Sequence, residues 1–216
     1  MNTAVEDLVL IGPRGLHARW AWVRGAVGVV LVLQASKRLG PCGVAVISGL
    51  RERGLAWMWL RLLAPGHRPW HGSPERIEVL GEGVLQALAW VRAQPGSAHS
   101  PVALFAERHG AQLACWLAVQ HPQAFAAIAS CHGHFDLSAA ETRQLRTPLL
   151  MLATGLDAPV VRNNHLVRVA LPRARLDVVH GASRSLTSLC ERDEIAHRAA
   201  AWLHQQLREA GRATRT

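Results

Sequence analysis

The sequence predicts an α/β protein in which helices cover both faces of a mostly parallel central sheet. Short runs of continuously apolar, often β-branched residues recur along the chain, as is typical of strands buried on both faces. Segments with helical spacing separate these runs, and such alternation indicates βαβ units. The length of 216 residues suits one domain, which can bury a full hydrophobic core without metals or disulfides.

Each element is predicted from its apolar pattern and its boundary residues. The strands are expected at 26–33, 55–60, 101–106, 124–130, 148–153 and 174–179. The helices are expected at 41–54, 75–93, 110–121, 138–146, 160–170 and 191–208. Pro41 opens the first helix and Gly54 closes it. Ser138 and Glu141 are spaced as a capping box. The helix at 75–93 carries an apolar stripe, formed by Ile77, Leu80, Val84, Leu88 and Val91.

The two ends of the chain are assigned separately from the main body. Residues 7–24 are the candidate for an antiparallel hairpin at one edge of the sheet. The polar residues at the C-terminus are expected to fray. This divides the chain into an N-terminal edge segment or hairpin (1–24), an α/β domain (25–208) and a frayed tail (209–216).

The chain is strongly basic, with 24 Lys and Arg against 15 Asp and Glu and a formal net charge of +9. An excess of positive charge favours anionic partners, including nucleic acid. The arginines are scattered, however, with no basic block and no interleaved run of aromatic residues. We therefore favour a soluble protein with an arginine-rich surface over a nucleic-acid binder, and a homo-oligomer remains open.

Cysteine and histidine usage argues against a metal site. The cysteines lie far apart and form no CxxC pair, which excludes zinc-ribbon and thioredoxin patterns; they are Cys42, Cys115, Cys131 and Cys190. Cys115 and Cys131 stand in apolar surroundings and are predicted to be buried thiols. The 12 histidines include the close pairs His67 with His71 and His132 with His134, but no HExxH-type helix is present. We expect no metal and no cofactor.

The N-terminal residues indicate a protein of the reducing cytoplasm. The first ten residues include Glu6 and Asp7 and lack the long apolar stretch of a secretion signal. The apolar segment 26–33 is too short to span a bilayer. We therefore expect neither export nor membrane association.

Four stretches carry a family resemblance. Residues 101–131, PVALFAERHGAQLACWLAVQHPQAFAAIASC, resemble the central strand, elbow, helix and next strand of small α/β-hydrolases, and most of all the dienelactone-hydrolase-like group. TPLLMLATGLDAPV (147–160) resembles the strand and acid-bearing loop, and LDVVHGASRSL (176–186) the loop that normally bears histidine. VVLVLQASKR (29–38) resembles the first buried strand and oxyanion loop. The resemblance covers residues 25–208 and implies a single-domain α/β-hydrolase fold.

The residues at the family's catalytic positions depart from its pattern. Active members carry small-x-Ser-x-Gly at the elbow, where a strained turn lifts the nucleophile to a helix N-terminus. Here the segment 106–110 reads Ala-Glu-Arg-His-Gly, so Arg108 takes the nucleophile position. Asp157 keeps the acid, but Arg184 aligns with the base. A guanidinium can neither form an acyl-enzyme nor accept a proton from a hydroxyl. Gln34 and Ala35 replace the usual His-Gly of the oxyanion loop.

These substitutions lead to two hypotheses about the vacated site. The first is a non-catalytic protein that binds a small anion or a protein partner, because arginines and a helix N-terminus converge there. Its candidate ligand-binding residues are Gln34, Lys37, Arg108, His109, Asp157 and Arg184. The second is a plugged cleft, in which Asp157 pairs with Arg108 or Arg184. Arg38 adds charge on the neighbouring loop.

Two further functions stay open. One is a weak or atypical carboxylic ester or lactone hydrolase of the dienelactone hydrolase type. Its nucleophile would be a displaced residue, either Cys131 with His132 or His134 beside it, or a serine such as Ser183. The other is the nucleic-acid binder, which rests on net charge alone.

Overall fold

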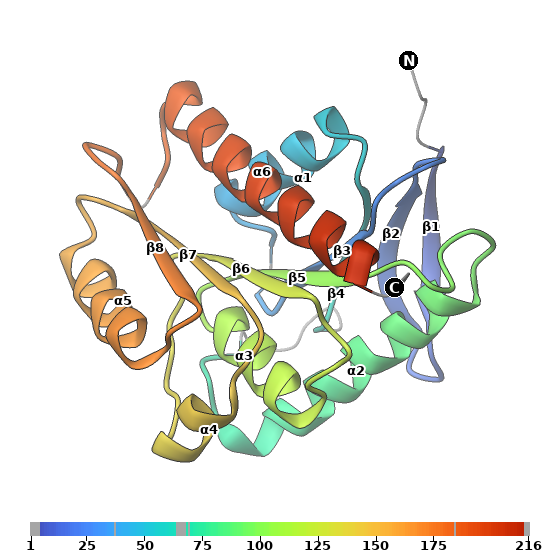
Figure 1. Ribbon diagram of the computed structural model, residues 1–216, viewed down its shortest axis with the longest axis horizontal. Coiled ribbons are helices and arrows are strands. Elements are labelled where there is room, and N and C mark those ends of the chain that lie inside the picture. Colours follow the sequence, from blue (N-terminus) through green and yellow to red (C-terminus); the bar gives the residue numbers. More distant parts are fainter. Residues whose placement is uncertain (1–4, 37, 64–67, 69, 184, 214–216) are drawn as a thin grey trace.

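An eight-stranded sheet forms the middle of the protein, and helices lie on both of its faces (Figure 1). The computed structural model describes residues 5–36, 38–63, 68, 70–183 and 185–213. The strands are β1 (Val5–Ile11), β2 (Leu16–Trp22), β3 (Val29–Gln34), β4 (Ala56–Arg61), β5 (Val102–Glu107), β6 (Ala127–Cys131), β7 (Leu149–Thr154) and β8 (Ala174–Val179). The helices are α1 (Pro41–Glu52), α2 (Pro74–Ala93), α3 (Gly110–Gln120), α4 (Ala139–Gln144), α5 (Ala158–Ala170) and α6 (Leu189–Ala213).

The strand order is β1-β2-β4-β3-β5-β6-β7-β8. Strands β3 to β8 pair in parallel, whereas β1 pairs antiparallel with β2 and β2 antiparallel with β4. The predicted α/β class with a mostly parallel sheet is confirmed. Because the central strands are parallel, their carboxyl ends meet along one edge of the sheet, where ligand sites of open α/β sheets lie.

Two apolar layers sandwich the sheet. One lies under α1 and α6 and the other under α2, α3 and α5, so strands such as β3 and β7 are buried along their whole length (Figure 1). Burial on both faces explains why these strands appear in the sequence as continuous apolar runs. The predicted stripe of α2 is buried in the second layer: Ile77, Leu80, Val84, Leu88 and Val91. None of the described helices is long and apolar enough to cross a membrane.

The largest departures from the predicted boundaries are at the end of α6 and at the starts of β3 and β6, which begin at Val29 and Ala127 rather than at 26 and 124. The first central strand was expected to start at residue 26, but the N–H of Ala26 closes a turn by donating to Val23, and pairing begins where the N–H of Val29 donates to Pro101. The last helix was expected to end at residue 208, before a frayed tail. It continues to Ala213 because its buried face extends through Leu203, Leu207 and Gly211.

Candidate ligand-binding cleft at the elbow

The turn between β5 and α3 has the strand–turn–helix form of a nucleophile elbow. Arg108 stands at its apex with φ +52°, a left-handed conformation that costs a non-glycine residue energy. Its backbone is fixed from both sides, because its N–H donates to the Cys131 carbonyl at 3.2 Å and its own carbonyl accepts from the His134 N–H at 3.0 Å. Small residues permit the sharp bend: a Cβ on Gly110 would lie only 3.2 Å from that of Ala106. The elbow thus presents an exposed guanidinium at the carboxyl edge of the sheet.

Glu107, directly before the apex, ties the elbow to the start of α1. Its Oε2 accepts the N–H of Gly40 at 2.8 Å and its Oε1 accepts the N–H of Gly43 at 2.9 Å. Burial raises the pKa of Glu107, while these backbone hydrogen bonds and the neighbouring Arg108 act in the opposite direction. The carboxylate therefore supplies the negative charge that the first turn of α1, which contains no acidic residue, lacks.

A cleft of about 620 Å³ opens beside the elbow. It is lined by the β3–α1 loop (33–36, 38 and 40), by Trp70 and His71 before α2, and by the elbow itself (107–110). Arg38 and Arg108, which are both exposed, line the cleft together with His71 and His109. The cleft is therefore predominantly cationic.

Three histidine rings form a row, and two of them, His71 and His109, line the cleft. The ring of His109 stacks on that of His134 at a centroid distance of 4.8 Å, and the ring of His71 meets His109 edge-on at 5.6 Å. His109 is thereby held between two rings from different loops. Sequence analysis named His109 as a ligand-binding candidate but gave no sign of this row.

The other ligand-binding candidates have mixed outcomes. Gln34 lines the cleft, but it is buried and its amide group is occupied: Nε2 donates to the Ser36 carbonyl at 2.9 Å and Oε1 accepts from the Trp59 indole at 2.8 Å. It shapes the loop. Asp157 follows β7 and is buried at the start of α5, and it is not among the described residues that line the cleft. Lys37 and Arg184 lie outside the described residues, as does His67.

The expectation for Cys131 was wrong. It is neither a buried thiol nor an available nucleophile, because it forms a disulfide with Cys42 across a Cα–Cα distance of 6.3 Å. The bond links the first turn of α1 to the end of β6. The two residues are 89 positions apart, so spacing along the chain could not show that the fold places them side by side. The prediction for Cys115 is confirmed: it is a buried free cysteine, and burial raises the pKa of its thiol to about 12.

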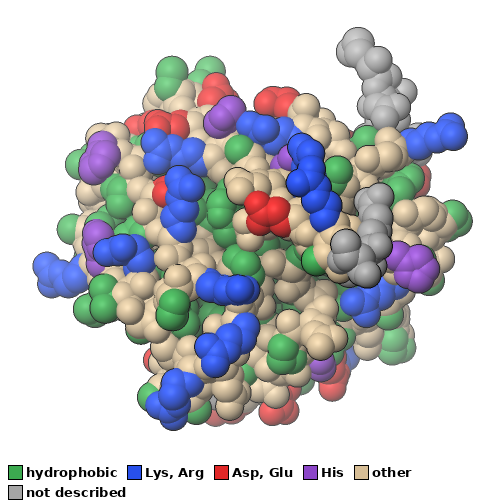
Figure 2. Space-filling model, viewed as in Figure 1, with side chains coloured by type: hydrophobic (Ala, Val, Ile, Leu, Met, Phe, Trp, Pro, Cys, Tyr) green, Lys and Arg blue, Asp and Glu red, His purple; other side chains and the backbone are tan. Residues whose placement is uncertain are grey.

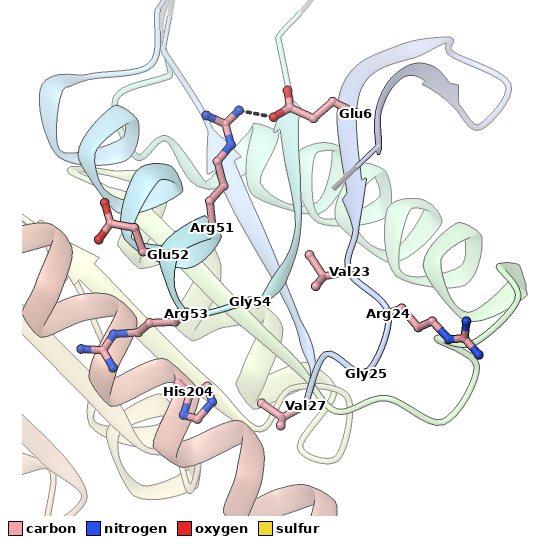
Figure 3. Close-up of a pocket in the computed structure, with 10 residues that line it drawn as sticks. All are labelled: Glu6, Val23, Arg24, Gly25, Val27, Arg51, Glu52, Arg53, Gly54 and His204. Atoms are coloured by element: carbon pink, nitrogen blue, oxygen red, sulfur yellow. Dashed lines mark hydrogen bonds and ion pairs between the residues drawn. The ribbon is translucent and has the colours of Figure 1, made fainter. Parts of the chain in front are cut away.

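A second hollow, of about 710 Å³, lies near the opposite edge of the sheet, between the end of α1, the turn before β3 and α6 (Figure 3). Arg51 is paired with Glu6, and the side chains of Arg24 and Arg53 point away from one another. This hollow is at the amino ends of the parallel strands, where α/β sheets do not usually bind ligands. We therefore take the elbow cleft as the candidate functional site.

The strand order and the strand–turn–helix elbow between β5 and α3 together define an α/β-hydrolase fold. Solved structures agree. The dienelactone hydrolase of Anabaena variabilis superimposes with a TM-score of 0.81 at 24% identity, over 94% of this chain and 98% of that one. A dienelactone hydrolase-like promiscuous phosphotriesterase, P91, from metagenomic libraries gives a TM-score of 0.73 at 14% identity, over 94% and 98% of the two chains. Est1E of Butyrivibrio proteoclasticus gives 0.74 at 9% identity, over 93% and 98%.

Sequence comparison is less specific. No family model matches the chain. A Mycobacterium tuberculosis protein named as a phosphoribosyl transferase is 26% identical over 159 residues, which is 73% of this chain. The match covers 36% of that protein, so the chain spans about a third of its length. These comparisons establish the fold.

Proposed function

We propose that this protein binds a small organic anion, a carboxylate or a phosphate ester, in the elbow cleft and does not process it through a serine-type triad. The observation that carries the proposal is the exposed guanidinium of Arg108 at the apex of the elbow. A guanidinium offers paired N–H donors that match a carboxylate or phosphate, and it stays protonated.

The surroundings of Arg108 favour an anion. Arg38 shares the cleft, and α3 begins two residues after the apex, so the positive end of its dipole faces the same space. Glu107 also lines the cleft, but its two carboxylate oxygens accept hydrogen bonds from the start of α1. An anion could therefore meet two arginines without facing an unengaged carboxylate.

The described lining offers little for acyl transfer. Its hydroxyl group belongs to Ser36, and that hydroxyl donates to the Arg38 carbonyl at 2.6 Å. An activated serine needs a base within hydrogen-bond reach of its hydroxyl. Binding is thus the simpler role for this cleft.

Calorimetric titration with phosphate monoesters and short dicarboxylates tests the proposal. Hydrogen bonds to charged groups contribute about 1.5–3 kcal/mol each, so Arg108→Ala should weaken binding about 10- to 100-fold. Arg108→Lys should also weaken it, because an ammonium cannot form the paired bonds. Arg162→Ala, which removes an exposed arginine of α5, is the matched control and should leave affinity unchanged. Equal affinity in Arg108→Ala and the wild type would reject the proposal.

A weak ester or lactone hydrolase is the second candidate. The retained elbow conformation and the likeness to dienelactone hydrolase and esterase structures favour it. The assay is p-nitrophenyl acetate turnover, with a fluorophosphonate probe to label any activated serine. Turnover that survives in Arg108→Ala and disappears in Ser36→Ala would support this candidate. We expect Arg108→Ser alone to remain inactive, because Arg184 aligns with the base position.

A nucleic-acid role gains no support from the surface in view. On the face drawn in Figure 2, Lys and Arg side chains are interspersed with hydrophobic and acidic ones and form no continuous stripe. Phosphate contacts along a nucleic acid need such a stripe.

A further inference from the structure

Behind the elbow, two sulfurs and an imidazole meet in the interior. Cys42 belongs to the first turn of α1, Cys131 ends β6, and His132 follows it. All three residues are buried, and their candidate ligand atoms lie within 4.8 Å of one another. The elbow-cleft proposal makes no use of this cluster.

The imidazole of His132 is already oriented as a metal ligand would be. Its Nδ1 lies 3.8 Å from the Sγ of Cys42 and 3.8 Å from the Sγ of Cys131. Its Nε2 lies 3.0 Å from the buried hydroxyl of Thr154 on β7. Metal-bound histidines typically use their second ring nitrogen in this way, which fixes the ring. The backbone of His132 has φ +50°, which non-glycine residues rarely adopt unless the surrounding structure holds them there.

We propose that the reduced form of this cluster is a binding site for a thiophilic metal ion, with Cu(I) the best fit. Two thiolates and one imidazole are soft ligands of the type that selects Cu(I) or Zn²⁺. A metal bound at about 2.3 Å to sulfur and about 2.1 Å to nitrogen separates these atoms by about 3.8 Å in trigonal geometry and about 3.6 Å in tetrahedral geometry. In the disulfide form each sulfur already lies 3.8 Å from Nδ1, near the trigonal value, and reduction lets the two sulfurs separate from each other. Structural Zn²⁺ sites almost always need a fourth ligand.

The disulfide and the metal compete for the same sulfurs, so the site depends on redox state. A dithiol reductant supplies two electrons and two protons: the Cys42–Cys131 bond breaks, each sulfur gains a hydrogen, and the dithiol closes to its own disulfide. Cu(I) then replaces the two thiol protons, which are released to solvent. The metal holds the sulfurs apart, at about 4 Å in a trigonal site.

Metal binding at this position would reach the elbow directly. The carbonyl of Cys131 accepts the backbone N–H of Arg108, and Cys42 lies between the two glycines that donate to Glu107. The remaining cysteines are elsewhere: Cys115 is buried in α3 and Cys190 is exposed at the start of α6. The inference does not depend on the proposed anion binding.

The test compares oxidised and reduced protein in a Cys190→Ser background, which removes the exposed thiol. After reduction with a dithiol and its removal under argon, the protein is titrated with Cu(I) in competition with a chromogenic Cu(I) chelator. We expect one Cu(I) per reduced chain and none per oxidised chain. Near-ultraviolet circular dichroism verifies that the reduced chain stays folded.

Variants locate the site. Cys42→Ser and Cys131→Ser should each lower Cu(I) affinity at least 100-fold, and His132→Asn and Thr154→Val should lower it about 10-fold or more, as ligand and supporting residues do. Cys115→Ala is the matched control and should bind normally. Absence of Cu(I) binding by the reduced parent would overturn the proposal without reference to any variant. Full retention of binding in Cys42→Ser would overturn it as well.

Discussion

Replacing Glu107 should destabilise the protein, because one carboxylate joins the elbow to the start of α1. Hydrogen bonds to charged groups contribute about 1.5–3 kcal/mol each, so the two bonds to Gly40 and Gly43 amount to about 3–6 kcal/mol before opposing effects are counted. Burial of the carboxylate, which raises its pKa, offsets part of this. We expect Glu107→Ala to lower the free energy of unfolding by about 2–3 kcal/mol and Glu107→Gln, which keeps one acceptor, by about 1–2 kcal/mol at neutral pH.

The pH dependence gives a second, independent signature. The pKa of Glu107 in the folded protein is raised above its ordinary value of 4.5, so the folded state binds more protons than the unfolded state between these values. The stability that the group contributes is therefore fully present below pH 4.5 and declines as pH rises through the folded pKa. Glu107→Gln cannot titrate, so the advantage of the wild type over this variant should shrink as pH rises.

Urea denaturation followed by tryptophan fluorescence measures both effects at fixed ionic strength. Glu78→Gln, which removes one exposed carboxylate from α2, is the matched control and should change stability little. An advantage of the wild type over Glu107→Gln that grows with rising pH would refute the reasoning. It would mean that the hydrogen bonds from α1 outweigh burial and lower the folded pKa.

Three further predictions concern packing, capping and a partly buried histidine. Gly49→Ala should lower the free energy of unfolding by about 2 kcal/mol, because the new Cβ would stand 2.8 Å from the Ala196 carbonyl oxygen between α1 and α6; an unchanged urea midpoint would contradict it. Ser138→Ala should remove about 1 kcal/mol of local stability from α4, measured as faster amide exchange there, because the hydroxyl accepts the Glu141 N–H in a capping box. Burial, Arg208 and Arg53 lower the pKa of His204 below 6.5, so the folded state favours the neutral imidazole. The stability that this group contributes is present above pH 6.5 and is lost as pH falls through the folded pKa. The melting temperature of His204→Gln should therefore fall less steeply than that of the wild type as pH is lowered below 6.5.

The layered fold could be predicted because it follows from local patterns. Strands β3 and β7 are buried along their length, so each is an apolar run in the sequence, and the stripe of α2 repeats with the helical period. The end of α6 was misplaced because the C-terminal residues are mostly polar and were expected to fray, although Gly211 lies on the buried face that the helix continues.

The candidate site was harder to predict from the sequence than the fold, because its contacts join segments that are distant in the chain. Nothing in the spacing of Cys42 and Cys131 indicates that α1 begins beside the end of β6. Glu107 did leave a signal. Helix α1 starts at Gly40-Pro41 with no side-chain cap and no acid in its first turn, so its N–H groups require an acceptor from elsewhere. The row formed by His71, His109 and His134 depends on three loops meeting, which no local pattern reports.

The stabilities of two Arg108 variants distinguish a ligand-binding role of this arginine from a role as a structural plug of the cleft. A non-glycine residue at φ +52° lowers the stability of the folded state by about 1–2 kcal/mol. Glycine adopts this conformation freely, but its greater freedom in the unfolded chain lowers the free energy of unfolding by about 0.4–1 kcal/mol. If the side chain serves only a ligand, Arg108→Gly should leave stability unchanged or raise it by up to about 1 kcal/mol while weakening anion binding about 10- to 100-fold, as Arg108→Ala does. If the guanidinium instead fills the cleft as a structural plug, the same variant should be less stable than the wild type. Arg108→Ala removes the side chain but keeps the strained backbone, so its difference from Arg108→Gly measures the strain alone. A stability loss shared by both variants would therefore show that the arginine is part of the packing, and the anion-binding proposal would lose its main support.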